Sequence, residues 1–156
     1  MNKKGDSYCK TSNIIKAEKQ LLRINHRLTN IRTNHVHQAT RAIIDRKPRF
    51  VCLEDLNVQG MMKNKHLSEK VQEQKIYEFR RQIEYKAHWA KISVIIADRW
   101  YPSSKTCISC GHVKKDLKLS DRTYICPICG NVIDRDFQAA LNLKRYGEAE
   151  LAKSAS

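Results

Sequence analysis

The chain has 156 residues, a length that suits one domain or one domain with a small added module. It contains 30 Lys and Arg against 16 Asp and Glu, a formal net charge of +14, so we expect a polyanion such as nucleic acid as partner. The apolar runs are too short to span a bilayer and we find no signal peptide. Composition therefore argues against a membrane protein and against a secreted disulfide-bonded miniprotein.

A long helix is predicted over residues 13–46, because apolar side chains recur there at spacings of three and four and the first proline is Pro48. Residues 1–50 hold 12 basic and three acidic side chains, so the basic excess is concentrated at the front. Arg23 and Arg27 lie on the polar faces of this helix and are candidate nucleic-acid contacts. A solvated charged face on a helix that packs by its apolar stripe explains the same pattern equally well.

Two short apolar runs, Phe50–Leu53 and Ile92–Ala97, predict strands that are buried on both faces. Between them, residues 57–65 contain Gly60 and read as a loop, and residues 68–90 have the period of a second helix. Strands alternating with helices indicate an α/β fold.

The C-terminal part begins with a cysteine-rich segment and ends in a helix. A short last helix is predicted over residues 137–146, stopped by Gly147, with a frayed tail from residue 148 to residue 156.

Four of the six cysteines form two tight pairs in the pattern C-x2-C-x15-C-x2-C. Each pair can close a turn that points two thiolates at one centre, and two such turns give the tetrahedral four-sulfur geometry of structural zinc. Gly111 and Gly130 follow the pairs, where the turn often needs a positive φ, and residues 118–125 are expected to form hairpin arms. The predicted ligands of one structural Zn²⁺ are Cys107, Cys110, Cys126 and Cys129.

The surroundings of these cysteines also suit a structural metal. Four thiolates on Zn²⁺ leave a formal charge of −2, which Lys105, His112, Lys114 and Lys115 can offset. Lys105, Lys114 and Lys115 are also candidate nucleic-acid contacts. A closed four-ligand site has no open position for water, so this zinc is not expected to be catalytic. Cys52 lies in an apolar run and is interpreted as a small core residue.

Two carboxylates stand where ligands gather in α/β folds: Glu54 at the end of a predicted strand, and Asp136 just before the last helix. Two-metal nucleases need converging carboxylates to hold Mg²⁺, and Arg135 could steady such acids or contact phosphate. Spacing alone leaves simpler interpretations open, because Asp134 or Asp136 also suits a helix cap and Glu54 an ordinary ion pair.

A set of motifs in a fixed order resembles the C-terminal part of TnpB-type proteins, the OrfB transposases of insertion sequences, which are similar to compact type V CRISPR effector nucleases. The resemblance covers nearly the whole chain from about Lys10. It is carried by Val51-Cys52-Leu53-Glu54-Asp55-Leu56-Asn57-Val58, Gly60-Met61, Tyr101-Pro102-Ser103-Ser104-Lys105-Thr106, the two cysteine pairs with their glycines, and Asp134-Arg135-Asp136 followed by Ala139, Ala140 and Asn142.

The resemblance implies a partial RNase H-like (RuvC-like) domain with a zinc-bearing insertion that binds the target nucleic acid. Family members are RNA-guided DNA endonucleases that use Mg²⁺, so it implies DNA and guide RNA as partners, a role associated with transposition and DNA recombination, and a prokaryotic cytoplasm or nucleoid. Glu54 matches the second catalytic carboxylate of the family and Asp136 the third. The four paired cysteines match its zinc ligands.

The chain also departs from the family pattern. The first catalytic carboxylate lies in the family on a strand upstream of the long helix, and no such motif exists here; Gln138 replaces an expected Asn. Family members are more than twice as long, so we expect a truncated copy that holds Mg²⁺ weakly or not at all, does not cut DNA alone, and could act beside a full-length partner. The open alternatives are a stand-alone zinc-ribbon nucleic-acid-binding module and a non-functional relic.

We therefore expect four segments. Residues 10–101 form the partial RuvC-like domain with its long basic helix, residues 102–133 the zinc ribbon, residues 134–147 the last RuvC-like segment, and residues 148–156 a flexible tail.

Overall fold

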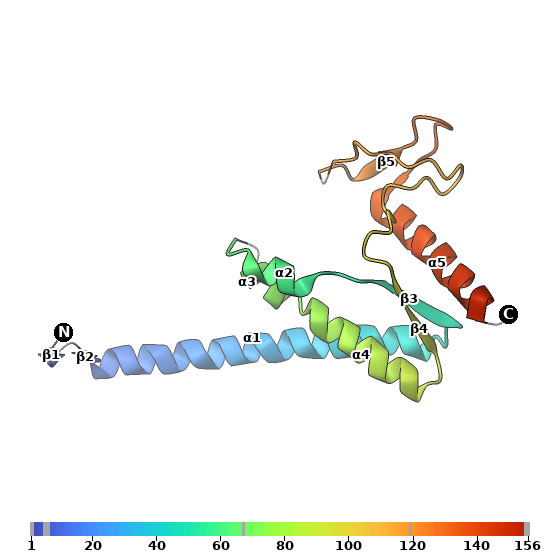
Figure 1. The fold of residues 1–156 in the computed structure, drawn as a ribbon. Helices are drawn as coiled ribbons and strands as arrows, with labels where there is room; N and C mark the ends of the chain where they lie inside the picture. Colours follow the sequence, from blue (N-terminus) through green and yellow to red (C-terminus); the bar gives the residue numbers. More distant parts are fainter. Residues whose placement is uncertain (1, 5–6, 67, 119, 155–156) are drawn as a thin grey trace. The chain divides into compact units, whose positions relative to one another are not determined.

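A computed structural model describes residues 2–4, 7–66, 68–118 and 120–154 (Figure 1). The chain divides into two compact units, the first made of residues 1–42 and 58–82 and the second of residues 43–57 and 83–156. Among the described residues, no helix combines the length and the apolar character that crossing a membrane requires.

The first unit is built along one long helix, α1 (Ser12–Asp45), which confirms the predicted helix to within one residue at each end. A two-stranded antiparallel hairpin, β1 (Asn2–Lys4) and β2 (Ser7–Cys9), precedes it. The alternative in which α1 packs by its apolar stripe does not hold for Leu21, Ile24 and Ile31, which are all about half exposed. Further along, Val36 and Thr40 are buried.

Two shorter helices and the first part of a third complete this unit, and they correct two predictions. The expected loop at 57–65 contains α2 (Val58–Lys63). The expected helix at 68–90 is two helices, α3 (Ser68–Glu73) and α4 (Ile76–Trp89). The break falls at Lys75, whose backbone adopts the left-handed conformation (φ 54°) that ends a helix and redirects the chain. Thr40 of α1 and Gln82 of α4 meet in a buried hydrogen bond, with the Thr40 hydroxyl 3.0 Å from Gln82 Oε1.

The second unit holds a two-stranded parallel sheet of β3 (Phe50–Glu54) and β4 (Ser93–Ala97), paired from Phe50 opposite Ser93 to Glu54 opposite Ala97. Both strands lie where they were predicted. Most residues of both strands are half-buried, so the predicted burial on both faces is wrong. Helix α5 (Arg135–Ser154) packs against both strands.

Helix α5 does not end at Gly147, as predicted, but continues to Ser154. Gly147 is buried, and a Cβ added to it would lie 2.3 Å from Cε2 of Phe50, so glycine is there for a close approach to β3 and not for a helix stop. The tail expected at 148–156 is helical up to residue 154, while residues 155–156 lie outside the described residues.

The cysteine-rich segment lies between β4 and α5 and is folded around its own small core. A short antiparallel hairpin, β5 (Thr123–Ile125) and β6 (Val132–Asp134), brackets the second cysteine pair. Cys107, Tyr124 and Cys126 are buried together, with Leu117 and Ile133 packed against them. Among the described residues of the predicted arm at 118–125, the strand covers the last three, and its partner strand follows the second pair of cysteines.

Candidate zinc centre and carboxylate pocket

The four paired cysteines converge on one point, as the spacing predicted. Their sulfur atoms all lie within 4.8 Å of one another. Cys107 Sγ is 3.6 Å from Cys129 Sγ, and Cys110 Sγ is 3.5 Å from Cys126 Sγ. A tetrahedron with Zn–S bonds of about 2.3 Å has edges of about 3.8 Å, so the donor set and its spacing fit one Zn²⁺.

Two matching backbone turns hold the thiols in place. In the first, Cys107 N donates to His112 O at 2.8 Å and Gly111 N to Cys107 O at 2.9 Å. In the second, Cys126 N donates to Asn131 O at 2.9 Å and Gly130 N to Cys126 O at 3.1 Å. Gly111 and Gly130 have φ of 76° and 69°, the left-handed conformation that the sequence predicted for them.

The same turns prepare the leading cysteine of each pair to ionise. Backbone N–H groups of Cys129 and Ile128 donate to Cys126 and lower the pKa of its thiol to about 6. Burial opposes ionisation of Cys107, but the N–H groups of Cys110 and Ser109, together with hydrogen bonds from the Cys129 and Cys110 thiols, lower the pKa of that thiol as well. The turns thus favour the thiolate form of Cys107 and Cys126, the form that binds a metal ion.

Two of the three lysines expected near the zinc bind the backbone of the ribbon, and the third is exposed. Lys105 Nζ donates to Lys115 O at 3.3 Å, and Lys114 Nζ donates to Ile125 O at 3.4 Å, so both ammonium groups bind the ribbon's own backbone. The side chain of Lys115 is exposed. Lys105 and Lys114 therefore help to hold the loops of the ribbon, whatever else they contact.

Glu54 lies at the C-terminal end of β3, exposed, on the rim of a pocket of about 180 Å³. The pocket is also lined by Asp55 and Asp98, which follow the two parallel strands, and by Leu143 of α5. Asp55 is paired with Arg99 at 2.5 Å. Glu54 accepts a hydrogen bond of 2.6 Å from the hydroxyl of Ser103, a contact that sequence reasoning did not find.

Ser103 belongs to a loop whose backbone carbonyl groups accept hydrogen bonds from side chains of α5. Asn142 Nδ2 donates to the carbonyl oxygens of Ser103 and Thr106, both at 2.7 Å, and Gln138 Nε2 donates to Ser104 O at 3.3 Å. Gln138 and Asn142 are fully buried. Two amide side chains four residues apart in an otherwise apolar helix pattern were the signal in the sequence that could have revealed this contact.

Asp134 and Asp136 separate into two roles. Asp134 Oδ1 accepts hydrogen bonds from the N–H groups of Asp136 at 2.9 Å and Phe137 at 2.8 Å, which makes it the N-cap of α5. Asp136 stands in the first turn with 71% of its side chain exposed, and Arg135 Nε approaches its Oδ1 at 3.4 Å. The cap interpretation is thus confirmed for Asp134, and Asp136 is left with an accessible carboxylate.

The carboxylates do not form a closed ligand set of their own. Within the part of the chain that the structure describes, the four cysteines are the one group of three or more His, Cys, Asp or Glu side chains whose ligand atoms converge. The Glu54 pocket is lined by the carboxylates of Glu54, Asp55 and Asp98, which are the kind of oxygen donor that Mg²⁺ prefers.

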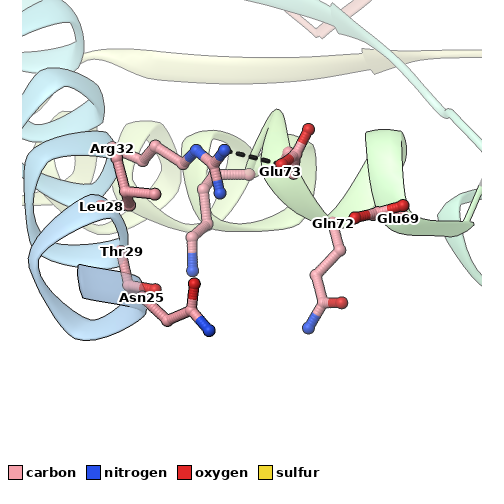
Figure 2. Close-up of a pocket in the computed structure, with 8 residues that line it drawn as sticks. Asn25, Leu28, Thr29, Arg32, Glu69, Gln72 and Glu73 are labelled. Atoms are coloured by element: carbon pink, nitrogen blue, oxygen red, sulfur yellow. Dashed lines mark hydrogen bonds and ion pairs between the residues drawn. The ribbon is translucent and has the colours of Figure 1, made fainter. Parts of the chain in front are cut away.

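The predicted basic face of α1 is present in the first unit. Arg23 and Arg27 are both exposed. Residues of α1 and α3 line a polar pocket of about 390 Å³ in this unit, and two of them, Arg32 and Glu73, form an ion pair at 2.7 Å (Figure 2). Arg32 is therefore held by an acid of its own chain, whereas the two predicted contacts face outward.

Comparison with known proteins shows similarity to one protein-family model and to several RNA-guided DNA endonucleases. Residues 77–143 match the family model "Cas12f1-like, TNB domain". A candidate RNA-guided DNA endonuclease of Streptomyces pristinaespiralis is 35% identical over 142 residues, which is 91% of this chain and 35% of that protein. The candidate RNA-guided DNA endonuclease InsQ of Escherichia coli K12 is 29% identical over 91% of this chain and 39% of its own length.

A CRISPR-associated endonuclease is among the relatives. Cas12f1 of Sulfoacidibacillus thermotolerans is 28% identical over 80% of this chain and 29% of that protein. The fold is similar to a chain in the cryo-EM structure of a Cas12f1–sgRNA–target DNA complex, with a TM-score of 0.54 and 21% identity over 85% of this chain and 36% of that one. The chain thus spans about a third of the length of the curated relatives that it matches.

Proposed function

Because the chain belongs to the TnpB- and Cas12f1-like family of RNA-guided endonucleases, we propose that it carries the zinc ribbon and part of the RuvC-like cleavage site of such an enzyme. In this proposal residues 10–101 and 134–147 are parts of the RuvC-like domain, and residues 102–133 contact the target nucleic acid. DNA and a guide RNA are the proposed partners, and an association with transposition comes with the family.

The four-cysteine centre is the observation that carries the proposal. Its geometry fits one Zn²⁺ held by four thiolates, and it falls inside the region that matches the Cas12f1-like TNB domain model. A four-thiolate site has no open position for substrate, so its contribution is to fold the ribbon. The ribbon core is otherwise small, which makes the metal a large part of its stability.

Glu54 and Asp136 are the proposed carboxylate ligands of Mg²⁺. Leu143 lines the Glu54 pocket, and Asp136 precedes Leu143 by seven residues on the same helix. Seven residues are nearly two turns, so both side chains project from one face, separated by about 10 Å along the axis. This arrangement supports Asp136 as an acid directed toward the Glu54 side of the fold.

Each residue then has a distinct task in DNA cleavage. Glu54 and Asp136 would hold the ion, which when bound supplies Lewis-acid stabilisation to a reacting phosphate. Arg135, beside Asp136, is the proposed contact to a phosphate oxygen, since a guanidinium can donate to it bidentately. The basic residues of the ribbon and α1, including Arg23, Arg27 and Lys115, bind the nucleic-acid backbone in this scheme.

We find no counterpart in the 156 residues for the first carboxylate of the family, and we therefore propose that the chain alone does not cut DNA. The test is incubation of the purified zinc-loaded chain with guide RNA, matching target DNA and Mg²⁺. The proposal predicts binding without cleavage. Mg²⁺-dependent cleavage that disappears in Glu54→Gln or Asp136→Asn would overturn the predicted inactivity and establish both acids as catalytic.

Nucleic-acid binding without catalysis is the second candidate function. The net charge of +14 and the exposed Arg23 and Arg27 favour it independently of the carboxylates. A binding module would retain its affinity when Glu54 is changed to Gln, whereas a chain that binds DNA through a metal ion at Glu54 would lose affinity in the same variant.

A further inference from the structure

The hydroxyl of Ser103 is placed to hold one oxygen of the Glu54 carboxylate. The two atoms are 2.6 Å apart, a short distance that is typical of a hydroxyl donating to an ionised carboxylate. Ser103 is 6% exposed, whereas Glu54 is exposed. The donor is thus fixed inside the protein, and the acceptor reaches it from the solvent side.

The position of Ser103 does not depend on Glu54, because α5 fixes the serine from the other side. Its carbonyl oxygen accepts from Asn142 Nδ2 at 2.7 Å, and its N–H donates to Tyr101 O at 2.8 Å. Asn142 holds Thr106 O with the same amide group, directly before the zinc ligand Cys107. Loss of the contact with Glu54 would therefore leave the hydrogen bonds that hold this loop in place.

The fixed Ser103 hydroxyl limits the motion of the exposed Glu54 side chain. A glutamate at an exposed strand end has three freely rotating bonds, so its carboxylate samples many positions. A fixed donor on Oε1 restricts those rotations and leaves Oε2 available. Groups that orient a ligating carboxylate in this way typically change metal affinity by about 10- to 100-fold when they are removed.

We propose that Ser103 is a positioning residue for Glu54, held in place by Asn142 of the helix that carries Asp136. The inference rests on the proposed function of Glu54 as a ligand of a divalent ion. It links the two carboxylates and the zinc ribbon through one loop, residues 101–107, fastened to α5.

The test is titration of the zinc-loaded chain with Mn²⁺ alone, followed by electron paramagnetic resonance, in Ser103→Ala, Ser104→Ala, Ser103→Thr and Glu54→Gln. Ser104→Ala is the matched control, because it removes a hydroxyl from the neighbouring residue and keeps the carbonyl that Gln138 binds. We expect Ser103→Ala to weaken Mn²⁺ binding about tenfold, Ser103→Thr to restore it, and Ser104→Ala to leave it unchanged. Zinc content and the melting temperature should stay the same in all four.

The two proposals fail in different ways. If Glu54→Gln binds Mn²⁺ as the wild type does, or if the wild type binds none, the function of Glu54 proposed above is wrong for this chain. If Glu54→Gln loses binding but Ser103→Ala does not, the positioning role is wrong. A loss in Ser103→Ala accompanied by loss of zinc or a lower melting temperature would show a merely structural serine.

A second measurement needs no divalent ion. Three-bond NMR couplings report whether the χ1 rotation of Glu54 is fixed or averaged. We expect one rotamer in the wild type and in Ser104→Ala, and averaging in Ser103→Ala. Averaged couplings in the wild type would overturn the positioning role whatever the Mn²⁺ titration gives.

Discussion

The Ser103 hydroxyl donates to the Glu54 carboxylate across 49 residues of sequence, joining the loop that enters the zinc ribbon to the end of a core strand. The segment that starts with Ser103 reaches the first zinc ligand four residues later. The backbone from Ser103 to Cys107 therefore connects the carboxylate pocket to the metal centre.

Zinc content is the first prediction. We expect one zinc per chain by elemental analysis, and we expect Cys126→Ser to release it, because three thiolates leave the tetrahedral site incomplete. Faster amide hydrogen exchange over residues 102–133 should accompany the loss. Cys9→Ser is the control, since Cys9 is exposed and outside the cluster. A wild-type chain with almost no metal in reducing buffer would contradict the zinc assignment.

Asp134 and Asp136 should differ in what their removal does. Asp134→Ala takes the cap from two N–H groups of α5 and should lower the free energy of unfolding by about 1 kcal/mol. Asp136→Asn keeps the shape of an exposed side chain and should lower it by less than about 0.5 kcal/mol. Urea denaturation measures both, and equal losses would contradict the division into cap and free carboxylate.

Gly147→Ala should destabilise the chain although alanine is the better helix former. The added Cβ would lie 2.3 Å from the ring of Phe50, and an overpacked contact of this kind costs about 1–3 kcal/mol. In the background of Phe50→Leu the same change should cost much less, because the ring is gone. A more stable Gly147→Ala would show that helix propensity alone, worth about 1 kcal/mol, decides at this position.

Duplex DNA binding should depend strongly on salt. The logarithm of the association constant should fall with the logarithm of salt concentration at about −0.9 for each phosphate neutralised. Replacing Arg23 and Arg27 with alanine should make the slope shallower by about two units if each residue contacts one phosphate. Lys153→Ala removes one positive charge elsewhere, from a lysine paired with Glu150, and should leave the slope unchanged. A flat salt dependence in the wild type would exclude a basic-face contact.

Acid stability should depend on Glu78. A hydrogen bond from Arg81 is the main reason that its pKa falls from the ordinary 4.5 to about 2. The depressed pKa means that this interaction stabilises the fold above about pH 4.5 and that its contribution is lost as the pH falls toward 2. Glu78→Gln should therefore lower the unfolding free energy at pH 7 by about 0.5–1 kcal/mol, with little effect at pH 2. Glu148→Gln, at a more exposed glutamate, serves as control, and an equal loss at both pH values would contradict the pKa assignment.

Local patterns in the sequence predicted several elements correctly. The spacing of apolar residues located α1 and both parallel strands, since these signals lie within a few neighbouring residues. The two cysteine pairs predicted their convergence for the same reason, because each turn is closed by residues within five positions of its first cysteine.

Features set by distant contacts were missed. Gly147 looked like a helix end, but its role is decided by Phe50, 97 positions earlier in the sequence. The helical spacing of apolar residues continues through Lys75, so this spacing did not predict the break between α3 and α4. Ser103 stands in the sequence as one residue of a motif, and its contact with Glu54 has no local signal because the two residues are 49 positions apart.

The pitch of helix α5 sets the spacing of three functional positions. These are the Asp136 carboxylate, the Asn142 amide that donates to the loop carbonyls, and Gly147, which Phe50 approaches closely. One residue inserted between Asp136 and Asn142 would rotate the acid by about 100° and shift it by about 1.5 Å. This stretch of helix therefore tolerates changes of side chain far more readily than changes of length.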